Sequence, residues 1–162
     1  MKTLHLLRHA KSDWSDPSLD DHDRPLNPRG QKARLLVAEH VRGWPVDLVV
    51  CSTAVRARAT AEPVVAALGC PVREERAIYE AGTGDLVEVV QALPDDAGVV
   101  LLVGHNPGFE QLTHVLCGTT PSYPTAALGT IELDVDTWQE VTLGSGRLVD
   151  HVTPAQLRER RA

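Results

Sequence analysis

Three short, continuous apolar runs constrain the fold of this chain more than any other feature of its sequence. They are LHLL at residues 4–7, DLVVC at 47–51 and GVVLLVG at 98–104. Each run is rich in valine and leucine, without the alternation of apolar and polar residues that a half-exposed strand shows. Such runs are typical of strands in a parallel sheet that helices cover on both faces. We therefore expect three buried strands in a mostly parallel sheet.

The segments between these runs have the residue patterns of helices. The first expected helix has Asn27 as its N-cap and Pro28 at its first position, and Gly43 and Pro45 end it. Four further helices are expected over residues 54–68, 85–93, 106–117 and 153–162. Because strands and helices alternate, the pattern predicts an α/β fold.

Three details complete the expected fold. Pro63 should kink or split the second helix, because proline lacks a backbone N–H, and Asp85 should cap the third. Two strand-like runs around a polar turn, over residues 129–143, predict an antiparallel hairpin. The expected architecture is thus a single domain over residues 1–162, a three-layer α/β/α sandwich whose mostly parallel sheet carries an antiparallel strand or hairpin.

Composition narrows the class of protein. The chain has 162 residues, 43% of them apolar, and a net charge of −6, which argues against a nucleic-acid-binding protein. No apolar run is long enough to span a membrane, and the N-terminus does not resemble a signal peptide, so we expect a soluble cytoplasmic protein. Cys51, Cys70 and Cys117 are widely spaced, which favours buried free thiols over a zinc site or disulfides.

Charged and imidazole side chains follow each apolar run. The first run ends in Arg8 and His9, the second leads to Arg56 in the first turn of the next helix, and the third leads to His105. In an open α/β sheet, ligands bind outside the carboxyl ends of the strands. A cation opposes the helix dipole where Arg56 lies, and an anion there would relieve the conflict. Because guanidinium groups bind phosphate bidentately, the pattern predicts a phosphate pocket.

A histidine among these arginines suits nucleophilic catalysis. Neighbouring cations lower the pKa of an imidazole, so part of it stays neutral at pH 7 and can attack phosphorus. The arginines would then stabilise the charge on the phosphoryl oxygens. The sequence contains neither a Walker loop nor a persuasive spacing of metal ligands, so we expect no metal and no cofactor.

Four segments resemble the histidine phosphatase superfamily, which includes the cofactor-dependent phosphoglycerate mutases. LLRHAKSDW resembles its Arg-His-Gly signature, RPLNPRGQKAR the stretch that follows, STAVRARATA the segment with the second arginine, and VGHNPG the segment with the second histidine. The four lie in the family's order within residues 4–108. The short chain and the RHAKSDW variant are similar to SixA-type phosphohistidine phosphatases, and the resemblance implies a phosphoglycerate mutase-like fold.

The resemblance implies a role for each matching residue. His9 would be the phosphorylated nucleophile, Arg8 and Arg56 would bind the phosphoryl oxygens, and His105 would bind phosphate and stabilise the transition state. Glu80 lies where larger members keep a general acid. Two departures are Ala10, where many members have glycine, and the absence of the long insertions of the mutases, which favours an open site.

The sequence leaves the substrate open. A phosphohistidine phosphatase should need Glu80 little, because protonated imidazole is a good leaving group. A phosphatase of small esters such as sugar phosphates needs an acid, and positioned acid catalysis contributes typically about 10²–10⁴-fold. A third alternative is a non-catalytic module that binds phosphoproteins. The expected partner is accordingly a phosphorylated protein or a small phosphorylated metabolite.

Other polar residues receive weaker predictions. Arg24 either reaches a substrate anion or forms an ion pair with Asp20, Asp21 or Asp23, and the acidic cluster around these aspartates reads as a solvated loop. We expect His5 in the core or behind the site. The segment DVDT at 134–137 resembles the nucleophile signature of haloacid-dehalogenase-type phosphatases. It lies at the wrong end of the chain and lacks a following lysine, so a hairpin turn explains it better.

Overall fold

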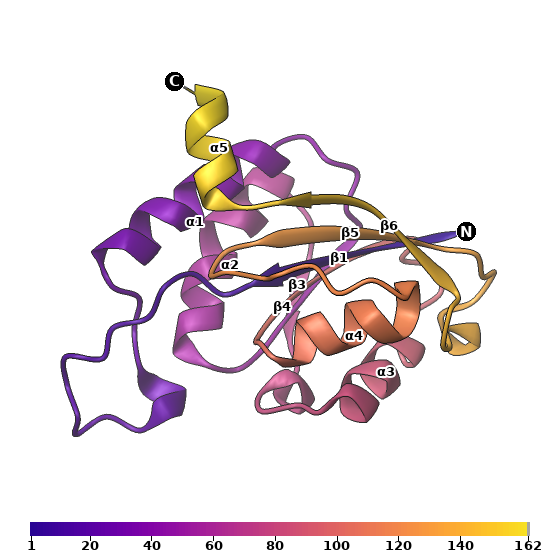
Figure 1. Cartoon of the computed structure of the whole chain (residues 1–162), viewed down its shortest axis with the longest axis horizontal. Helices are drawn as coiled ribbons and strands as arrows, with labels where there is room; N and C mark the ends of the chain where they lie inside the picture. The colour runs from indigo at the N-terminus through magenta and orange to yellow at the C-terminus, as the bar shows by residue number, and fades with distance from the viewer. Residues whose placement is uncertain (162) are drawn as a thin grey trace.

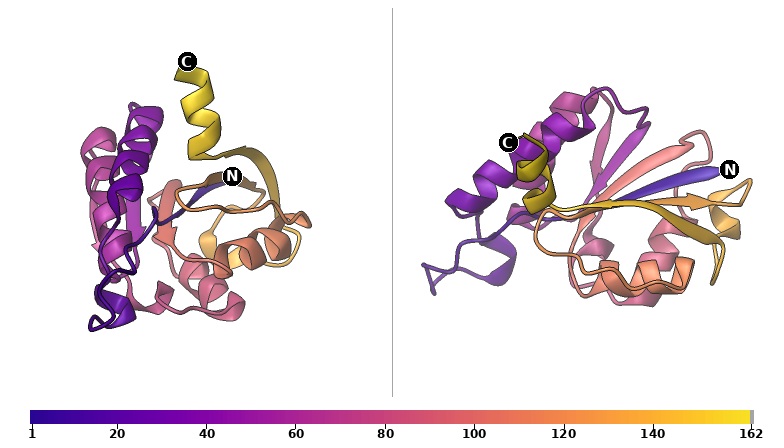
Figure 2. Two further views of the ribbon diagram at one scale, coloured as in Figure 1. Left: turned by 60° about the vertical axis from the view of Figure 1, so that its left-hand side comes forward. Right: turned by 45° about the horizontal axis from the view of Figure 1, so that its top comes forward.

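A computed structural model describes residues 1–161 as a six-stranded sheet between two layers of helices. Helices α1 and α2 cover one face, and α3 and α4 cover the other (Figure 1; Figure 2). The strands are β1 (Lys2–Arg8), β2 (Leu48–Cys51), β3 (Val72–Glu74), β4 (Val99–Gly104), β5 (Leu128–Leu133) and β6 (Gly146–Val152). The helices are α1 (Pro28–Val41), α2 (Val55–Leu68), α3 (Thr83–Gln91), α4 (Gly108–Cys117) and α5 (Pro154–Arg161).

The sheet has the order β3-β2-β4-β1-β5-β6. The first four strands in this order are parallel, whereas β5 pairs antiparallel with β1 and β6 pairs antiparallel with β5. This arrangement confirms the predicted three-layer α/β fold with a mostly parallel sheet. Within residues 1–161, no helix combines the length and the apolar character needed to cross a membrane.

The predicted apolar runs form the centre of the sheet and feed two cores. Leu4 and Leu6 of β1 face the α3–α4 layer, while Leu7 faces the α1–α2 layer, and all three are fully buried. Successive side chains of a strand point to opposite faces, so a run buried on both sides must be apolar throughout. The core positions of these runs are thus explained by their sequence.

The second strand of the predicted hairpin lies elsewhere. The first strand is β5, as expected, but the run near Trp138 forms a short 3-10 helix (Trp138–Glu140), and β6 follows at Gly146–Val152. Trp138 is fully buried, and its indole N–H donates to the carbonyl of Ala97 at 2.8 Å. This anchor draws the run off the sheet, and the chain turns at Gly144, with φ +76°, before β6 begins.

Two expectations about helices differ from the structure, because Pro63 does not split α2 and Asp85 is not the N-cap of α3. Helix α2 continues through Pro63, because Arg34 Nη1 donates to the carbonyl oxygen of Ala59 at 2.8 Å, the group that a proline at position 63 leaves without its usual partner. Helix α3 begins at Thr83 rather than at Asp85. The Asp85 carboxylate instead accepts the backbone N–H of Gly82 at 3.1 Å. The short edge strand β3 was not predicted.

Candidate active site

The carboxyl ends of three neighbouring strands bring the predicted site together. Strand β4 lies between β2 and β1, and their ends are in register, so the residues that follow them emerge side by side. These residues are Ser52, His9 and His105. The ring centroids of His9 and His105 lie 5.2 Å apart, and Arg56 of α2 places Nε 3.4 Å from Nε2 of His9.

His9 is a buried imidazole whose Nε2 is unprotonated and accepts a long hydrogen bond from Nε of Arg56, at 3.4 Å. Its Nδ1 lies 2.7 Å from the carbonyl oxygen of Ala10, which only accepts, so Nδ1 carries the proton and Nε2 keeps its lone pair. Burial lowers the pKa of His9 to about 4, and the charges of the neighbouring arginines act in the same direction. His9 is therefore neutral at pH 7, and Nε2 is available as a nucleophile.

Arg56 is held beside His9 by the acidic loop that precedes α1. Its Nη1 donates to the backbone oxygen of Asp21 at 2.7 Å, and its Nη2 donates to the Asp21 carboxylate at 3.1 Å. The side chain is only 8% exposed. A buried guanidinium needs such partners, and they fix it in the plane from which it reaches His9.

Arg8 is positioned from the other side of the site. Its Nη1 donates to the carbonyl oxygen of Tyr123 at 2.8 Å, and that carbonyl also accepts from Nδ2 of Asn106. The carboxylate of Glu110 accepts from Asn106 and from the backbone N–H of Tyr123, which fixes the loop. The Arg8 Nε is buried and has no hydrogen-bond partner within residues 1–161.

His105 is oriented by Ser52. Its Nε2 lies 2.7 Å from Oγ of Ser52, and its Nδ1 is buried and lacks a partner among the described residues. Burial lowers the pKa of His105 to about 3, with smaller contributions in that direction from His9 and Arg56. Arg8 Nε and His105 Nδ1 are thus buried polar atoms that a phosphoryl oxygen could satisfy.

The acidic loop is exposed, as predicted, but one of its members, Asp21, also takes part in the site. Its carboxylate accepts from Arg24 Nη2 at 2.6 Å and from the Tyr79 hydroxyl at 2.7 Å, in addition to Arg56. Burial raises the pKa of Asp21, but these hydrogen bonds and the charge of Arg56 outweigh it and hold the pKa well below its usual range.

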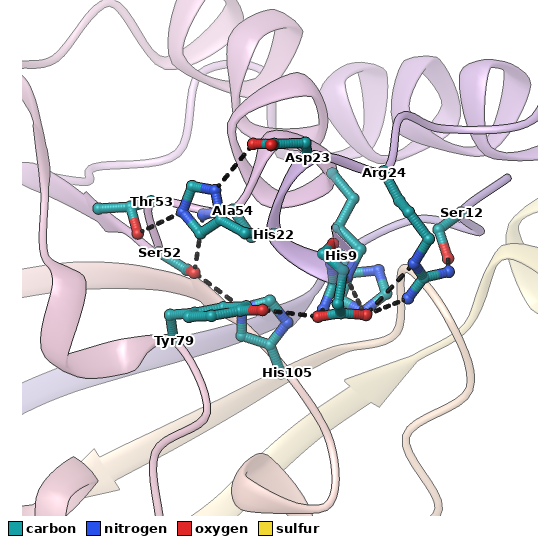
Figure 3. A network of polar contacts seen from close by, with 12 residues as sticks. His9, Ser12, His22, Asp23, Arg24, Ser52, Thr53, Ala54, Tyr79 and His105 are labelled. Atoms are coloured by element: carbon teal, nitrogen blue, oxygen red, sulfur yellow. Dashed lines mark hydrogen bonds and ion pairs between the residues drawn. The ribbon is translucent and has the colours of Figure 1, made fainter. Parts of the chain in front are cut away.

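Arg24 forms the ion pair that the sequence left as one of two alternatives. Its guanidinium is buried, and besides Asp21 it bonds Oγ of Ser12 at 3.1 Å. Figure 3 shows Arg24 and Ser12 on one side of His9, with Tyr79 and His105 on the other. Arg24 contributes positive charge near His9, and its guanidinium is held in place by Asp21 and Ser12.

Glu80 lies at the rim of the site and not in its centre. It is exposed and has a left-handed backbone, with φ +55°, which is unusual for a residue other than glycine. It lines a cavity of about 390 Å³ together with His105 and Asn106. Within residues 1–161, no hydrogen bond joins Glu80 to His9 or Arg56.

Several residues that help to build the site were not predicted, among them Ser12, Ser52, Tyr79, Asn106, Glu110 and Tyr123. Ser52 could have been found, because it directly follows the second apolar run, at the same sheet edge as His9 and His105. Tyr79 and Tyr123 carry no such signal. Tyr79 follows a 3-10 turn, and Tyr123 acts through its backbone carbonyl, which any residue has.

The described residues contain no group of three or more histidine, cysteine or acidic side chains placed to hold a metal ion. Positive charge at the site comes instead from Arg8, Arg24 and Arg56. The arrangement can bind a tetrahedral anion, and it can present a neutral imidazole nitrogen to the central atom of that anion.

Comparison with known sequences identifies relatives. The family profile of the histidine phosphatase superfamily (branch 1) matches residues 4–97. The uncharacterized protein Rv1276c of Mycobacterium tuberculosis is 33% identical and is matched over 91% of this chain and 99% of its own length. An uncharacterized chloroplastic protein of Arabidopsis thaliana is 30% identical over 90% of this chain and 72% of its own.

Comparison with solved structures gives the same family of folds. A candidate phosphohistidine phosphatase SixA from Nakamurella multipartitia has a TM-score of 0.84 and 27% identity, with 94% of this chain and 96% of that chain covered. Its counterpart from Agrobacterium tumefaciens has a TM-score of 0.81 and 28% identity, with 94% of this chain and 98% of that chain covered. A mycobacterial glucosyl-3-phosphoglycerate phosphatase shares the fold. It is 17% identical, with a TM-score of 0.70, and 93% of this chain and 98% of that chain are covered.

Proposed function

Because the chain belongs to the histidine phosphatase superfamily, we propose that it dephosphorylates phosphohistidine on proteins through a covalent intermediate at His9. That it is a phosphatase follows from the family and from its structural neighbours. The observation that carries the proposal is the neutral, buried imidazole of His9, whose Nε2 lies against the guanidinium of Arg56.

The phosphoryl group would be held by donors on both sides of His9. Arg56 supplies its guanidinium, while Arg8 Nε and His105 Nδ1 are buried without protein acceptors among the described residues. These groups come from three different strand ends and surround one imidazole. Preorganised donors of this kind stabilise the charge that develops on the phosphoryl oxygens, which is the main demand of phosphoryl transfer.

The reaction would proceed in two displacements at phosphorus. In the first, His9 Nε2 forms a bond to phosphorus as the bond to the substrate nitrogen breaks, and the electron pair leaves with the substrate ring. If that ring carries a proton on its other nitrogen, it departs as neutral imidazole. In the second, water attacks phosphorus, the bond to Nε2 breaks with its electron pair returning to His9, and both protons of the water leave with the inorganic phosphate as H2PO4−. His9 is then neutral again.

A phosphohistidine substrate carries a good leaving group, so the proposed reaction does not depend on Glu80. An acid that protonates an alkoxide must lie within hydrogen-bond reach of the leaving oxygen. Glu80 is exposed at the rim and bonds neither His9 nor Arg56 within the described chain. A departing imidazole makes no such demand. The likeness to two candidate SixA phosphatases, over 94% of this chain in each case, supports the same substrate class.

A phosphatase of small phosphate esters is the second candidate. The cavity of about 390 Å³ beside His105 could receive a sugar, and Glu80 lines it. In that case Glu80 would be the acid, and its removal should lower kcat by about 10²–10⁴-fold.

One set of assays separates the two candidates. Wild type, His9→Ala and Glu80→Gln would each be given a phosphohistidine peptide and a panel of sugar phosphates. We expect wild type and Glu80→Gln to hydrolyse the peptide at similar rates, and His9→Ala to be inactive. A strong preference for one sugar phosphate, lost in Glu80→Gln, would overturn the phosphohistidine assignment. Failure to trap labelled phosphate on His9 would contradict the covalent intermediate.

A further inference from the structure

A second cluster of positive charge lies beside the active site. Lys11, Arg29 and Arg158 line a recess of about 220 Å³, whose remaining wall includes Pro124, Thr125 and Pro154. No acidic residue lines it. The three cations come from distant parts of the chain, the loop after β1, the first turn of α1 and the helix α5, and Figure 2 shows α5 lying beside α1.

These three cations have no partner, a property that they share among the described residues with Lys32, Arg73, Arg76, Arg160 and Arg161 but that is set apart here by their gathering around one recess. Lys11, Arg29 and Arg158 make neither an ion pair nor a side-chain hydrogen bond with any residue in the range 1–161. By contrast, five arginines pair with carboxylates, namely Arg24, Arg42, Arg56, Arg58 and Arg147. In a chain with a net charge of −6, three unpaired cations around one recess mark a place that attracts anions.

The position of Arg29 supports the same conclusion. It lies in the first turn of α1, where a cation opposes the helix dipole and lowers helix stability. Its placement is therefore not explained by the needs of the helix. A bound anion would offset the mutual repulsion of the three side chains.

The recess is lined by residues that closely follow the catalytic site along the chain. Lys11 lies two residues after His9, and its backbone oxygen accepts the N–H of Asn27, the N-cap of α1. Pro124 follows Tyr123, whose carbonyl holds Arg8. Two residues further along, the backbone N–H of Ala126 donates to the carbonyl oxygen of His9 at 3.0 Å. The chain segments that position His9 and Arg8 therefore also supply part of the lining of the recess.

We propose that the recess binds carboxylate side chains of the phosphoprotein substrate, near its phosphorylated histidine in space. The inference rests on the proposed function, because it assigns the docking surface of that same reaction. Carboxylates fit the charge of the recess, and the flexible lysine and arginine side chains suit an exposed, extended segment. The recess thereby distinguishes acidic phosphoprotein segments from neutral ones.

The test compares two phosphohistidine peptides, one with glutamates on both sides of the phosphorylated residue and one with glutamines at those positions. The quantity measured is the ratio of their kcat/KM values, acidic over neutral. We expect a ratio of about ten for wild type, because several exposed charge pairs would each contribute a modest free energy of binding. The triple variant Lys11→Gln, Arg29→Gln, Arg158→Gln should bring the ratio to about one.

A control triple variant removes the same charge elsewhere on the surface and should keep the wild-type ratio. Its substitutions are Arg42→Gln, Arg73→Gln and Arg147→Gln. A wild-type ratio near one, or an equal loss in both triple variants, would overturn the inference. So would an effect of the recess variant confined to a bisphosphorylated small ester, which would assign the recess to a second phosphate. If wild type hydrolyses sugar phosphates but neither peptide, the proposed function fails, and the docking surface with it.

Discussion

Lowering the pH should unfold this protein more readily because His9 is buried without a charge. An ordinary histidine has a pKa near 6.5, whereas burial lowers that of His9 to about 4. As the pH falls below 6.5, His9 therefore takes up a proton in the unfolded chain but stays unprotonated in the native state. The native pKa is the lower one, so the penalty is absent above pH 6.5, grows as the pH falls, and is complete below pH 4.

The size of the effect follows from the two pKa values. The proton taken up by the unfolded chain costs native stability about 2 kcal/mol between pH 7 and pH 5, and about 3 kcal/mol by pH 4. His9 is 7% exposed, so little solvent screening reduces these values. His5 and His105, whose pKa values are lowered to about 4 and about 3, act in the same direction.

Urea unfolding of wild type and His9→Gln at pH 7 and pH 5 isolates the contribution of His9. The substitution removes the titrating group, so the variant should lose about 2 kcal/mol less stability over this interval, whatever its stability at pH 7. Equal losses in the two proteins would refute the buried, neutral His9. The same pKa predicts the pH dependence of kcat/KM. After correction for the ionisation of the substrate's own phosphate, kcat/KM should fall on the acid side only near pH 4, where His9 becomes protonated. A fall near pH 6.5 would contradict it.

Four other changes test the site and the fold. Asp21→Asn should strengthen inhibition by inorganic phosphate about fivefold, since a carboxylate no longer competes for Arg56, and an unchanged Ki would contradict this. Ser52→Ala should lower kcat about tenfold by releasing the ring of His105, with stability changed by only about 1 kcal/mol, and wild-type kcat would refute the positioning role. Excess EDTA should leave activity intact, and strong inhibition would contradict a reaction run by arginines alone. Arg34→Met should reduce the free energy of unfolding by about 1 kcal/mol while sparing activity, because a carbonyl in α2 loses its donor; unchanged stability in urea would be the contrary result.

The parts of the fold that were predicted are those with a local cause. Continuous apolar runs such as 98–104 can only be buried on both faces, and the carboxyl ends of parallel strands share one edge of the sheet. The sequence alone was therefore enough to predict that His9, Arg56 and His105 lie together. The N-cap at Asn27, whose side chain accepts the N–H of Gly30, is equally local.

The parts that were missed depend on contacts between distant residues. The acidic loop was correctly predicted to be exposed, but nothing near Asp21 in the sequence indicates that it bonds Arg56, 35 positions away. Pro63 suggests a break in the helix when only the local sequence is considered, because the donor that compensates for it, Arg34, lies on another helix. In each case a partner brought close only by the fold supplies what the local sequence lacks.

The hydrogen bond from Arg8 to the carbonyl oxygen of Tyr123 has a consequence for the evolution of this enzyme. All four recognisable motifs end by residue 108, yet Arg8 is oriented by a carbonyl in the segment before β5, and β5 itself borders the strand that carries Arg8. A shortened fragment that retains every motif would lose this clamp. Exchange of the region after residue 117 between homologues could therefore retune turnover while every signature residue stayed the same.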